Sequence, residues 1–188
     1  ETIFFDPRRT TAGIVTAGGV CPGINDVVRS MVMQLRYGYG VERVLGFRFG
    51  FGGLDPRTTT EPLLLDPGVV RGIHGRGGTF LGTSRGICDV ELLADGLVSR
   101  GVDILFAIGG DGTMRAAHAL AGVLLRRGAP IGVVGVPKTI DNDIPFVDKT
   151  FGFDSAVAVA RTAIDAAHAE ATSVDRGIGL VKLMGRHA

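Results

Sequence analysis

The chain has 188 residues, of which 45% are hydrophobic, 21% are charged and 30 are glycine, as expected for one globular α/β domain with ligand-approaching loops. Its formal net charge of +1 argues against a basic surface for nucleic acid, and no apolar run is long enough to span a membrane. Two cysteines, Cys21 and Cys88, are too few for a disulfide framework and have no metal-ligand spacing, so a reducing, cytoplasmic setting is expected.

The first half of the chain alternates between strand-like and helix-like segments. In chain order we predict a strand over 12–17, a helix capped by Asn25 or Asp26, a strand over 41–47, an extended segment over 58–67, a short helix over 69–74 and a helix over 91–100. A glycine-rich turn over 18–25 follows the first strand, and another over 46–54 ends the second. A loop over 75–86 carries two arginines.

The second half repeats this alternation and contains the most apolar strand. Here we predict a strand over 103–108, a helix over 114–127, a strand over 131–136, a helix over 153–171 capped by Asp154 or Ser155, and a last strand over 178–183. The runs over 103–108 and 131–136 are continuous rather than alternating, which favours parallel strands buried on both faces. The fold class predicted is therefore α/β, with a Rossmann-like parallel sheet, helices on both faces and ligands at the carboxyl ends of the strands.

The turn Gly110-Asp111-Gly112-Thr113 joins a predicted strand to a predicted helix. Such a turn leaves backbone N–H groups pointing outward, which suits a phosphate. Asp111 would repel a phosphate alone, but a divalent cation between the two removes the conflict, so the turn indicates a metal-bound nucleotide. The structural alternative is a tight connection in which Asp111 only caps the helix.

Three polar turns follow strands and, in a parallel sheet, face the same crevice. Besides the turns at 18–25 and 110–113, the segment 139–143 places two carboxylates two residues apart, and Asp141 or Asp143 could act as base toward an acceptor hydroxyl. Arg85 offers a fixed positive charge for phosphate oxygens. Purely structural alternatives are a solvated Arg85 and an Asx-turn cluster at Asp141–Asp143.

Five motifs, taken together and in order, closely resemble the 6-phosphofructokinase family. They are Gly18-Gly19 with Pro22-Gly23-Ile24-Asn25, Gly82-Thr83-Ser84-Arg85, Gly110-Asp111-Gly112-Thr113, Pro137-Lys138-Thr139-Ile140-Asp141-Asn142-Asp143 and Met184-Gly185-Arg186. The chain looks most like the long-chain, plant- and actinobacteria-like branch, where the first turn carries Cys-Pro and the later one Pro-Lys-Thr. The match covers nearly the whole chain.

The resemblance implies transfer of the γ-phosphate of Mg-ATP to the 1-hydroxyl of fructose 6-phosphate, giving the bisphosphate of glycolysis. It makes Asp141 the base and Asp111 the residue that holds Mg²⁺. By the same resemblance, the nucleotide site would be lined by Gly18, Arg85, Gly86, Gly110, Asp111, Gly112 and Thr113. The substrate site would be lined by Thr139, Ile140, Asp141, Asp143, Met184, Gly185 and Arg186. Phe51 falls where the family often has an aromatic near the nucleotide.

The phosphoryl donor depends, by this resemblance, on two positions. Glycine at position 112 goes with ATP, whereas an aspartate there goes with pyrophosphate because its carboxylate fills the space and repels the α-phosphate. Lys138 is also carried by pyrophosphate users, but the pair Gly112 with Lys138 looks like the ATP-dependent long-chain members. ATP is therefore expected, with pyrophosphate as the alternative.

The chain starts without methionine and stops directly after an apolar run, so we expect a piece of a longer protein. Residues 1–188 would form the N-terminal nucleotide-binding domain, with 154–188 leading into a missing substrate domain. The resemblance implies a homo-oligomer, dimer or tetramer, and a piece that is inactive alone. A non-catalytic nucleotide-binding subunit is a more distant alternative, as are NAD kinases and lipid kinases, which share the Gly-Gly-Asp-Gly turn but lack the segment 137–143.

Overall fold

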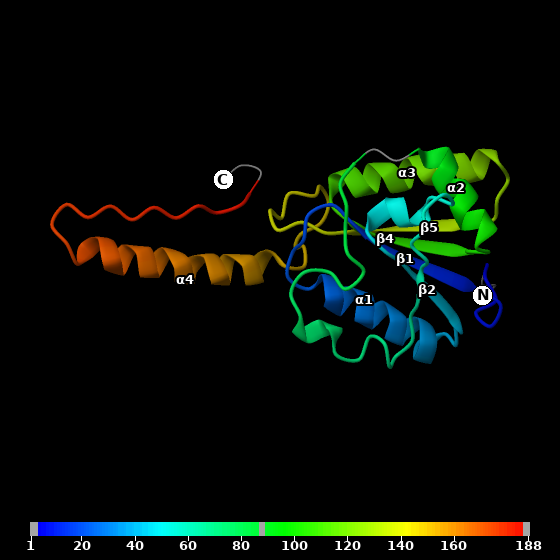
Figure 1. Ribbon diagram of the computed structural model, residues 1–188, viewed down its shortest axis with the longest axis horizontal. Helices are drawn as coiled ribbons and strands as arrows, with labels where there is room; N and C mark the ends of the chain where they lie inside the picture. Colours follow the sequence, from blue (N-terminus) through cyan, green and yellow to red (C-terminus); the bar gives the residue numbers. More distant parts are fainter. Residues whose placement is uncertain (1–3, 87–88, 186–188) are drawn as a thin grey trace.

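A five-stranded sheet lies at the centre of the computed structural model, which describes residues 4–86 and 89–185 (Figure 1). The strands are β1 (Thr11–Ala17), β2 (Arg43–Phe47), β3 (Leu63–Leu64), β4 (Ile104–Gly109) and β5 (Gly132–Pro137). Their order is β3-β2-β1-β4-β5, with all neighbours parallel except the antiparallel pair β2 and β3. The short β3 falls within the extended segment predicted over 58–67.

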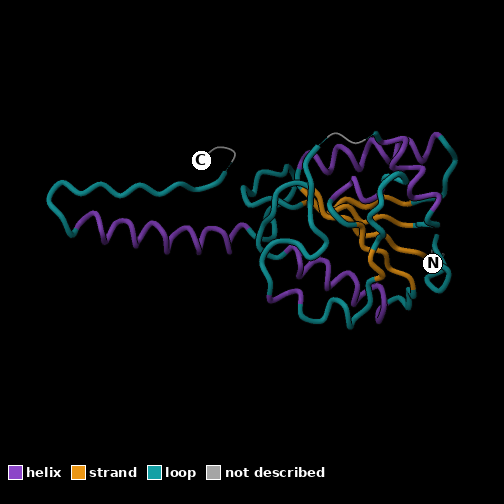
Figure 2. The backbone as a smooth tube through the Cα atoms, viewed as in Figure 1, coloured by secondary structure: helices purple, strands orange, loops and turns teal. Residues whose placement is uncertain are grey.

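Helices cover both faces of this sheet, as the alternation of elements predicted. On one face lies α1 (Ile24–Met33), and on the other lie α2 (Val90–Ser99) and α3 (Asp111–Arg126) (Figures 1 and 2). Each layer has its own apolar cluster, one built on Val28 and Val32 of α1 and the other on Leu97 and Leu120 of α2 and α3. Three short helical segments, Gln34–Gly38, Gly50–Leu54 and Ile73–Gly75, complete the domain.

The register of the sheet brings three strand ends level with one another. All seven residues of β1 are buried, which identifies it as the central strand. Ala17 at its end pairs with Gly109 at the end of β4, and Gly109 in turn pairs with Pro137 at the end of β5. The turns that follow these strands therefore start at the same edge of the sheet, which is where ligands bind in this class of fold.

Gly96 shows how tightly α2 packs against the rest of the domain. A β-carbon on Gly96 would lie 1.7 Å from the carbonyl oxygen of Leu54, whereas one on Gly122 of α3 would meet nothing closer than the Arg126 side chain at 3.6 Å. Helix propensity alone favours alanine over glycine at both positions. The backbone of Leu54 cannot move aside like a flexible side chain. At Gly96 the steric cost of a β-carbon is therefore expected to outweigh the gain in helix propensity.

We expect Gly96→Ala to lower the free energy of unfolding by about 1–3 kcal/mol, the usual cost of overpacking a well-filled interior. The matched control Gly122→Ala is expected to raise it by about 0.5–1 kcal/mol, because only the propensity term remains there. Urea denaturation, with hydrogen exchange of the α2 amides to locate the change, measures both. A stabilised Gly96→Ala protein would contradict the packing argument.

The last helix, α4 (Phe153–Thr172), projects away from the sheet, and the chain then runs back along it (Figure 1). None of its 20 residues is buried. The returning segment packs closely at two glycines, since β-carbons on Gly177 and Gly179 would lie 2.1 Å and 2.7 Å from carbonyl oxygens of α4. It forms no strand in the described residues, so the prediction over 178–183 was wrong, because an extended apolar run becomes a strand only where another strand pairs with it.

Several predicted boundaries were also wrong. Both predicted side-chain caps fail, because Gly23 and Gly152, in left-handed conformation with φ of 93° and 90°, stand at the N-caps of α1 and α4. The predicted helix over 69–74 is a set of turns ending in the short 3-10 helix Ile73–Gly75. The strand β5 is only partly buried, with Val134 40% exposed, because it is the edge strand of the described sheet. No helix in the described parts of the chain is long and apolar enough to cross a membrane.

Candidate active site

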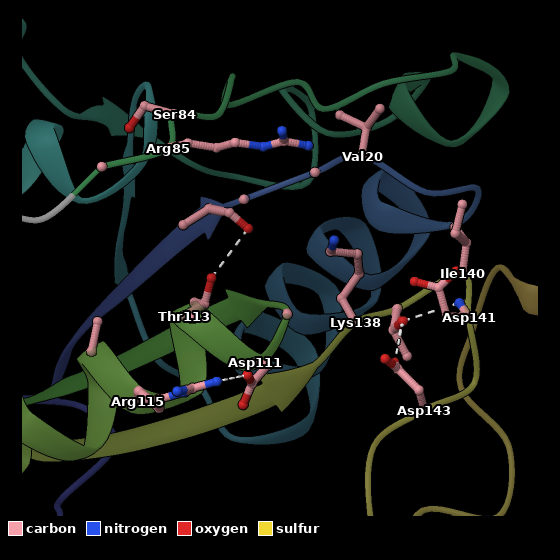
Figure 3. Close-up of a pocket in the computed structure, with 18 of the residues that line it drawn as sticks. Val20, Ser84, Arg85, Asp111, Thr113, Arg115, Lys138, Ile140, Asp141 and Asp143 are labelled. Carbon is pink, nitrogen blue, oxygen red and sulfur yellow. Dashed lines mark hydrogen bonds and ion pairs between the residues drawn. The ribbon is translucent and has the colours of Figure 1, made fainter. Parts of the chain in front are cut away.

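A cavity of about 1080 Å³ opens at the level carboxyl ends of β1, β4 and β5. Figure 3 shows side chains pointing into it from each of the turns that follow these strands. The predicted site residues that line it are Gly18, Arg85, Gly86, Gly110, Asp111, Gly112, Thr113, Lys138, Thr139, Ile140, Asp141, Asp143, Met184 and Gly185. Arg186, the remaining predicted site residue, lies outside the described residues.

The turn after β4 is shorter than predicted, because α3 already begins at Asp111 with Gly110 as its N-cap. Gly112 and Thr113 therefore belong to the first helical turn, whose N–H groups have no partner within the helix and face an incoming anion. The Asp111 side chain does not cap the helix, which argues against the purely structural alternative. It instead pairs with Arg115, one turn further along (Figure 3).

Gly112 has open space where a side chain would project. A β-carbon built there meets no heavy atom within 4 Å, and the residue is exposed at the wall of the cavity. The backbone at Gly112 is helical, so glycine is not required by a left-handed conformation. The missing side chain therefore leaves room in the cavity rather than relieving strain in the fold.

Hydrogen bonds join the end of β1 and its glycine turn to the loop of Arg85 and to the start of α3. Gly18 has a φ of 84°, and its N–H donates to the Ser84 carbonyl at 3.0 Å, while the Thr83 hydroxyl donates to the Gly18 carbonyl at 2.7 Å. These bonds tie the loop that carries Arg85 to the end of β1. Thr113, also buried, donates its hydroxyl to the Ala17 carbonyl at 3.3 Å. Arg85 is thus held over the same edge of the sheet as the start of α3.

Asn25, predicted as a helix cap, instead fixes the other end of the arginine loop. Its side chain is buried, donates to the Arg76 carbonyl at 2.9 Å and accepts from the Phe80 N–H at 2.7 Å. These two bonds bridge α1 to a segment more than fifty residues away in the chain. The first glycine turn and the loop of Arg85 are therefore held as one unit.

Lys138 is the positive charge at the floor of the cavity. It is only 6% exposed, and its backbone N–H continues the sheet by donating to the Gly109 carbonyl at 2.9 Å. Burial lowers the pKa of Lys138, as does the charge of Arg85, while Cys21 and Asp141 act in the opposite direction. A partly desolvated ammonium interacts more strongly with an entering phosphate than one in water does.

Cys21 is a buried residue that interacts electrostatically with this lysine. Burial raises the pKa of its thiol to about 11, against the opposing effect of the Lys138 charge. The thiol lies 3.6 Å from the Phe151 carbonyl oxygen and 3.3 Å from that of Pro22. The residue is therefore a neutral packing group at neutral pH.

The loop after β5 holds both predicted carboxylates at the cavity wall. The Thr139 hydroxyl donates to Asp143 Oδ1 at 2.8 Å and accepts from the Asp141 N–H at 3.0 Å (Figure 3). Thr139 is buried, and its hydroxyl is engaged inside the loop both as a donor and as an acceptor. The loop is thus folded so that Asp141 and Asp143 both face the cavity.

Sequence reasoning missed some residues of the cavity wall. Gly19 is one of them, since a β-carbon there would lie 3.3 Å from Arg85 Nη2 and 3.8 Å from Lys138 Nζ. Its place as the second glycine of the turn could have revealed it. Arg115, four residues after Asp111, could have been found from helical spacing. Leu93 of α2 and Lys182 of the returning segment enter only through the tertiary structure.

The fold and the site define an α/β domain with a parallel sheet and a cavity, at the carboxyl ends of its strands, that is lined by three carboxylates, Asp111, Asp141 and Asp143. Residues 11–188 match the family described as Phosphofructokinase, and the chain belongs to that family.

Curated relatives support the same assignment. The chain is 53% identical over 186 residues to the ATP-dependent 6-phosphofructokinase of Amycolatopsis methanolica, covering 99% of this chain and 40% of the relative. It is 48% identical to the ATP-dependent 6-phosphofructokinase 7 of Arabidopsis thaliana, covering 100% of this chain and 38% of the relative. The chain thus spans about two fifths of the length of these relatives. The predicted likeness to actinobacterial and plant proteins is confirmed.

Solved structures show the same fold. The chain resembles the phosphofructokinase of Saccharomyces cerevisiae with a TM-score of 0.74 and 29% identity, over 87% of this chain and 24% of that one. It also resembles a pyrophosphate-dependent phosphofructokinase from Marinobacter aquaeolei, with a TM-score of 0.76 over 87% of this chain and 42% of that one. At 24% identity, this second likeness concerns the fold alone.

Proposed function

We propose that the chain is the N-terminal part of an enzyme that transfers the γ-phosphate of ATP to the 1-hydroxyl of fructose 6-phosphate. The observation that carries the proposal is the single cavity lined by both Asp111, at the start of α3, and Asp141, in the loop after β5. The two acids suit the two needs of phosphoryl transfer, charge neutralisation on the donor and orientation of the acceptor. Relatives about 50% identical that are named ATP-dependent 6-phosphofructokinases support it.

The nucleotide phosphates would lie between the start of α3 and the first glycine turn. There the N–H groups of the Gly110–Thr113 segment, the charge of Arg85 and the ammonium of Lys138 would bind their oxygens. Gly18 and Gly86 would let the backbone approach closely. The buried Phe51, which also lines the cavity, would contact the base of the nucleotide.

Mg²⁺ fits this site as an ion shared between protein and phosphates. In the described parts of the chain, no group of three or more His, Cys, Asp or Glu side chains could hold a metal by itself. Mg²⁺ commonly uses one or two carboxylates together with phosphate oxygens and water, and Asp111 beside the phosphate-binding turn supplies such a carboxylate. When bound, the ion would neutralise charge on the transferring phosphate. The Asp111 carboxylate would then exchange its pairing with Arg115 for the ion.

The acceptor sugar would lie on the side of the cavity formed by the loop after β5. Asp141 would accept the proton of the 1-hydroxyl and hold that oxygen in line with the γ-phosphate. Thr139, Ile140 and Asp143 would flank the reacting groups. Met184 and Gly185, with Arg186 beyond the described residues, would contact the sugar phosphate.

Residues 1–188 would form the nucleotide-binding domain, and the segment from 154 onward would lead into the substrate domain of the longer enzyme. The exposed apolar side chains of the projecting part, such as Val159 and Ile178, are consistent with further chain packing there. We further propose that the enzyme assembles as a dimer or tetramer in the cytoplasm. By itself the 188-residue chain is expected to be inactive.

The donor is tested by assaying the full-length enzyme with Mg-ATP and with pyrophosphate on fructose 6-phosphate. We expect turnover with ATP, because Gly112 leaves the cavity wall open where a nucleotide would lie. Turnover with pyrophosphate and none with ATP would make pyrophosphate the donor. This alternative is tested because pyrophosphate-dependent members of the family also carry a lysine at position 138. Nucleotide binding without turnover on either donor would favour a non-catalytic subunit.

A further inference from the structure

Asn142 stands between the two carboxylates of the site but has a different role from either. It does not line the cavity, whereas its neighbours Asp141 and Asp143 do. Its backbone has a φ of 50°, in the left-handed region that residues other than glycine rarely adopt. Asparagine tolerates this conformation better than most residues do, and such positions in proteins cluster near functional sites.

The Asn142 side chain joins the loop to residues 148–150, which lie just before α4. Its Oδ1 accepts from the Thr150 N–H at 2.8 Å and lies 3.2 Å from the Thr150 hydroxyl. Its Nδ2 donates to the Asp148 carbonyl at 3.2 Å. The side-chain amide therefore uses both its donor and its acceptor within the loop.

Thr150 links this segment back to Thr139 at the start of the loop. It is only 4% exposed, and its hydroxyl donates to the Thr139 carbonyl at 2.8 Å. Thr139 is the residue whose own hydroxyl bonds the Asp141 N–H and the Asp143 carboxylate. One network of hydrogen bonds thus links Asn142 through Thr150 and Thr139 to the backbone N–H of Asp141 and to the carboxylate of Asp143.

We propose that Asn142 and Thr150 are positioning residues that hold the Asp141 carboxylate in line with the acceptor hydroxyl without touching the substrate. The inference rests on the proposed function, because it assigns Asp141 the role of base. In phosphoryl transfer, orientation contributes more than proton abstraction, so a small shift of this loop strongly affects the rate. The nucleotide side of the cavity shares none of these bonds, so the nucleotide KM would be spared.

The test uses the full-length enzyme and three variants. Asn142→Gly keeps the left-handed backbone without strain but removes the amide, and Thr150→Val removes the hydroxyl at nearly constant shape. Both are expected to lower kcat by about 10- to 100-fold, with the KM for ATP within about 2-fold of wild type. Thr150→Ser keeps the hydroxyl and is expected to retain kcat within about 3-fold, which is the conservative rescue.

The result that would overturn the inference is a wild-type kcat in Asn142→Gly, or equal losses in Thr150→Ser and Thr150→Val. A parallel loss of kcat, ATP affinity and folded protein would also overturn it, since that pattern indicates a structural role. Hydrogen exchange of the Thr150 N–H gives a readout independent of activity. We expect this N–H to be protected in wild type and unprotected in Asn142→Gly. Equal exchange rates in the two proteins would contradict the hydrogen bond between Thr150 and the Asn142 side chain. The wild-type assay with both donors tests the proposed function separately.

Discussion

Replacing Asp141 with alanine is expected to lower kcat by about 10²–10⁴-fold, the usual contribution of a general base. The affinity for nucleotide should stay near the wild-type value, because the groups proposed to bind the nucleotide phosphates, the N–H groups at the start of α3, Arg85 and Lys138, are all retained. Steady-state kinetics with Mg-ATP and fructose 6-phosphate, together with equilibrium nucleotide binding, separate the two effects. A loss confined to kcat indicates an interaction made in the transition state.

Asp148→Asn is the matched control for this variant. Asp148 belongs to the same loop and is exposed, and the substitution keeps the backbone carbonyl that accepts from Asn142. It also removes one negative charge, so it reproduces the electrostatic change without touching the cavity wall. We expect near wild-type turnover. If Asp141→Ala retained the turnover of this control, another group would have to orient the acceptor hydroxyl.

Gly112→Asp is expected to lower kcat/KM for ATP by at least about 100-fold, because juxtaposed like charges at an interface cost several kcal/mol. The fold should tolerate the change, since Gly112 has helical backbone and open space around its β-carbon position. An acidic residue in the first turn of a helix is favourable to the helix itself. The loss would therefore reflect repulsion of the nucleotide phosphates, and assays with ATP and pyrophosphate measure it.

Gly112→Asn separates charge from size in this experiment. It has nearly the shape of aspartate but no charge, so its kcat/KM for ATP should fall less than that of Gly112→Asp. Thermal denaturation of both variants checks that the domain stays folded. Equal losses in the two variants would mean that bulk rather than charge closes the site. An undiminished ATP activity in Gly112→Asp would place the nucleotide away from this part of α3.

Residues whose hydrogen-bond partners lie far away in the chain are the ones whose roles differ most from those predicted. Asn25 has the right residue type and place for a helix cap, yet its amide bonds the backbone of Arg76 and Phe80. Local pattern cannot distinguish these uses, because the competing partners lie over fifty residues away. The caps of α1 and α4 are instead glycines in left-handed conformation.

Whether a predicted strand forms also depends on partners that are distant in the chain. The run ending at Gly109 is a strand because its neighbours β1 and β5 pair with it on both sides. The run over 178–183 is also largely apolar, but the described chain offers it no strand to pair with, and Leu180 is 93% exposed. Apolar patterning reports a preference for burial, and only the arrangement of the other strands provides the hydrogen-bonding partner.

By itself the sequence determined the alternation of strands and helices, the change from strand to helix at Gly110 and the pair of acids at Asp141 and Asp143, because these depend on residue type and short spacing. Only the tertiary structure decided that Lys138 is buried at the cavity floor and that Gly112 faces open space. It also decided how Asn142 and Thr150 fasten the acidic loop. Burial, open space and long-range hydrogen bonds arise from packing between distant segments, which no local pattern of residues contains.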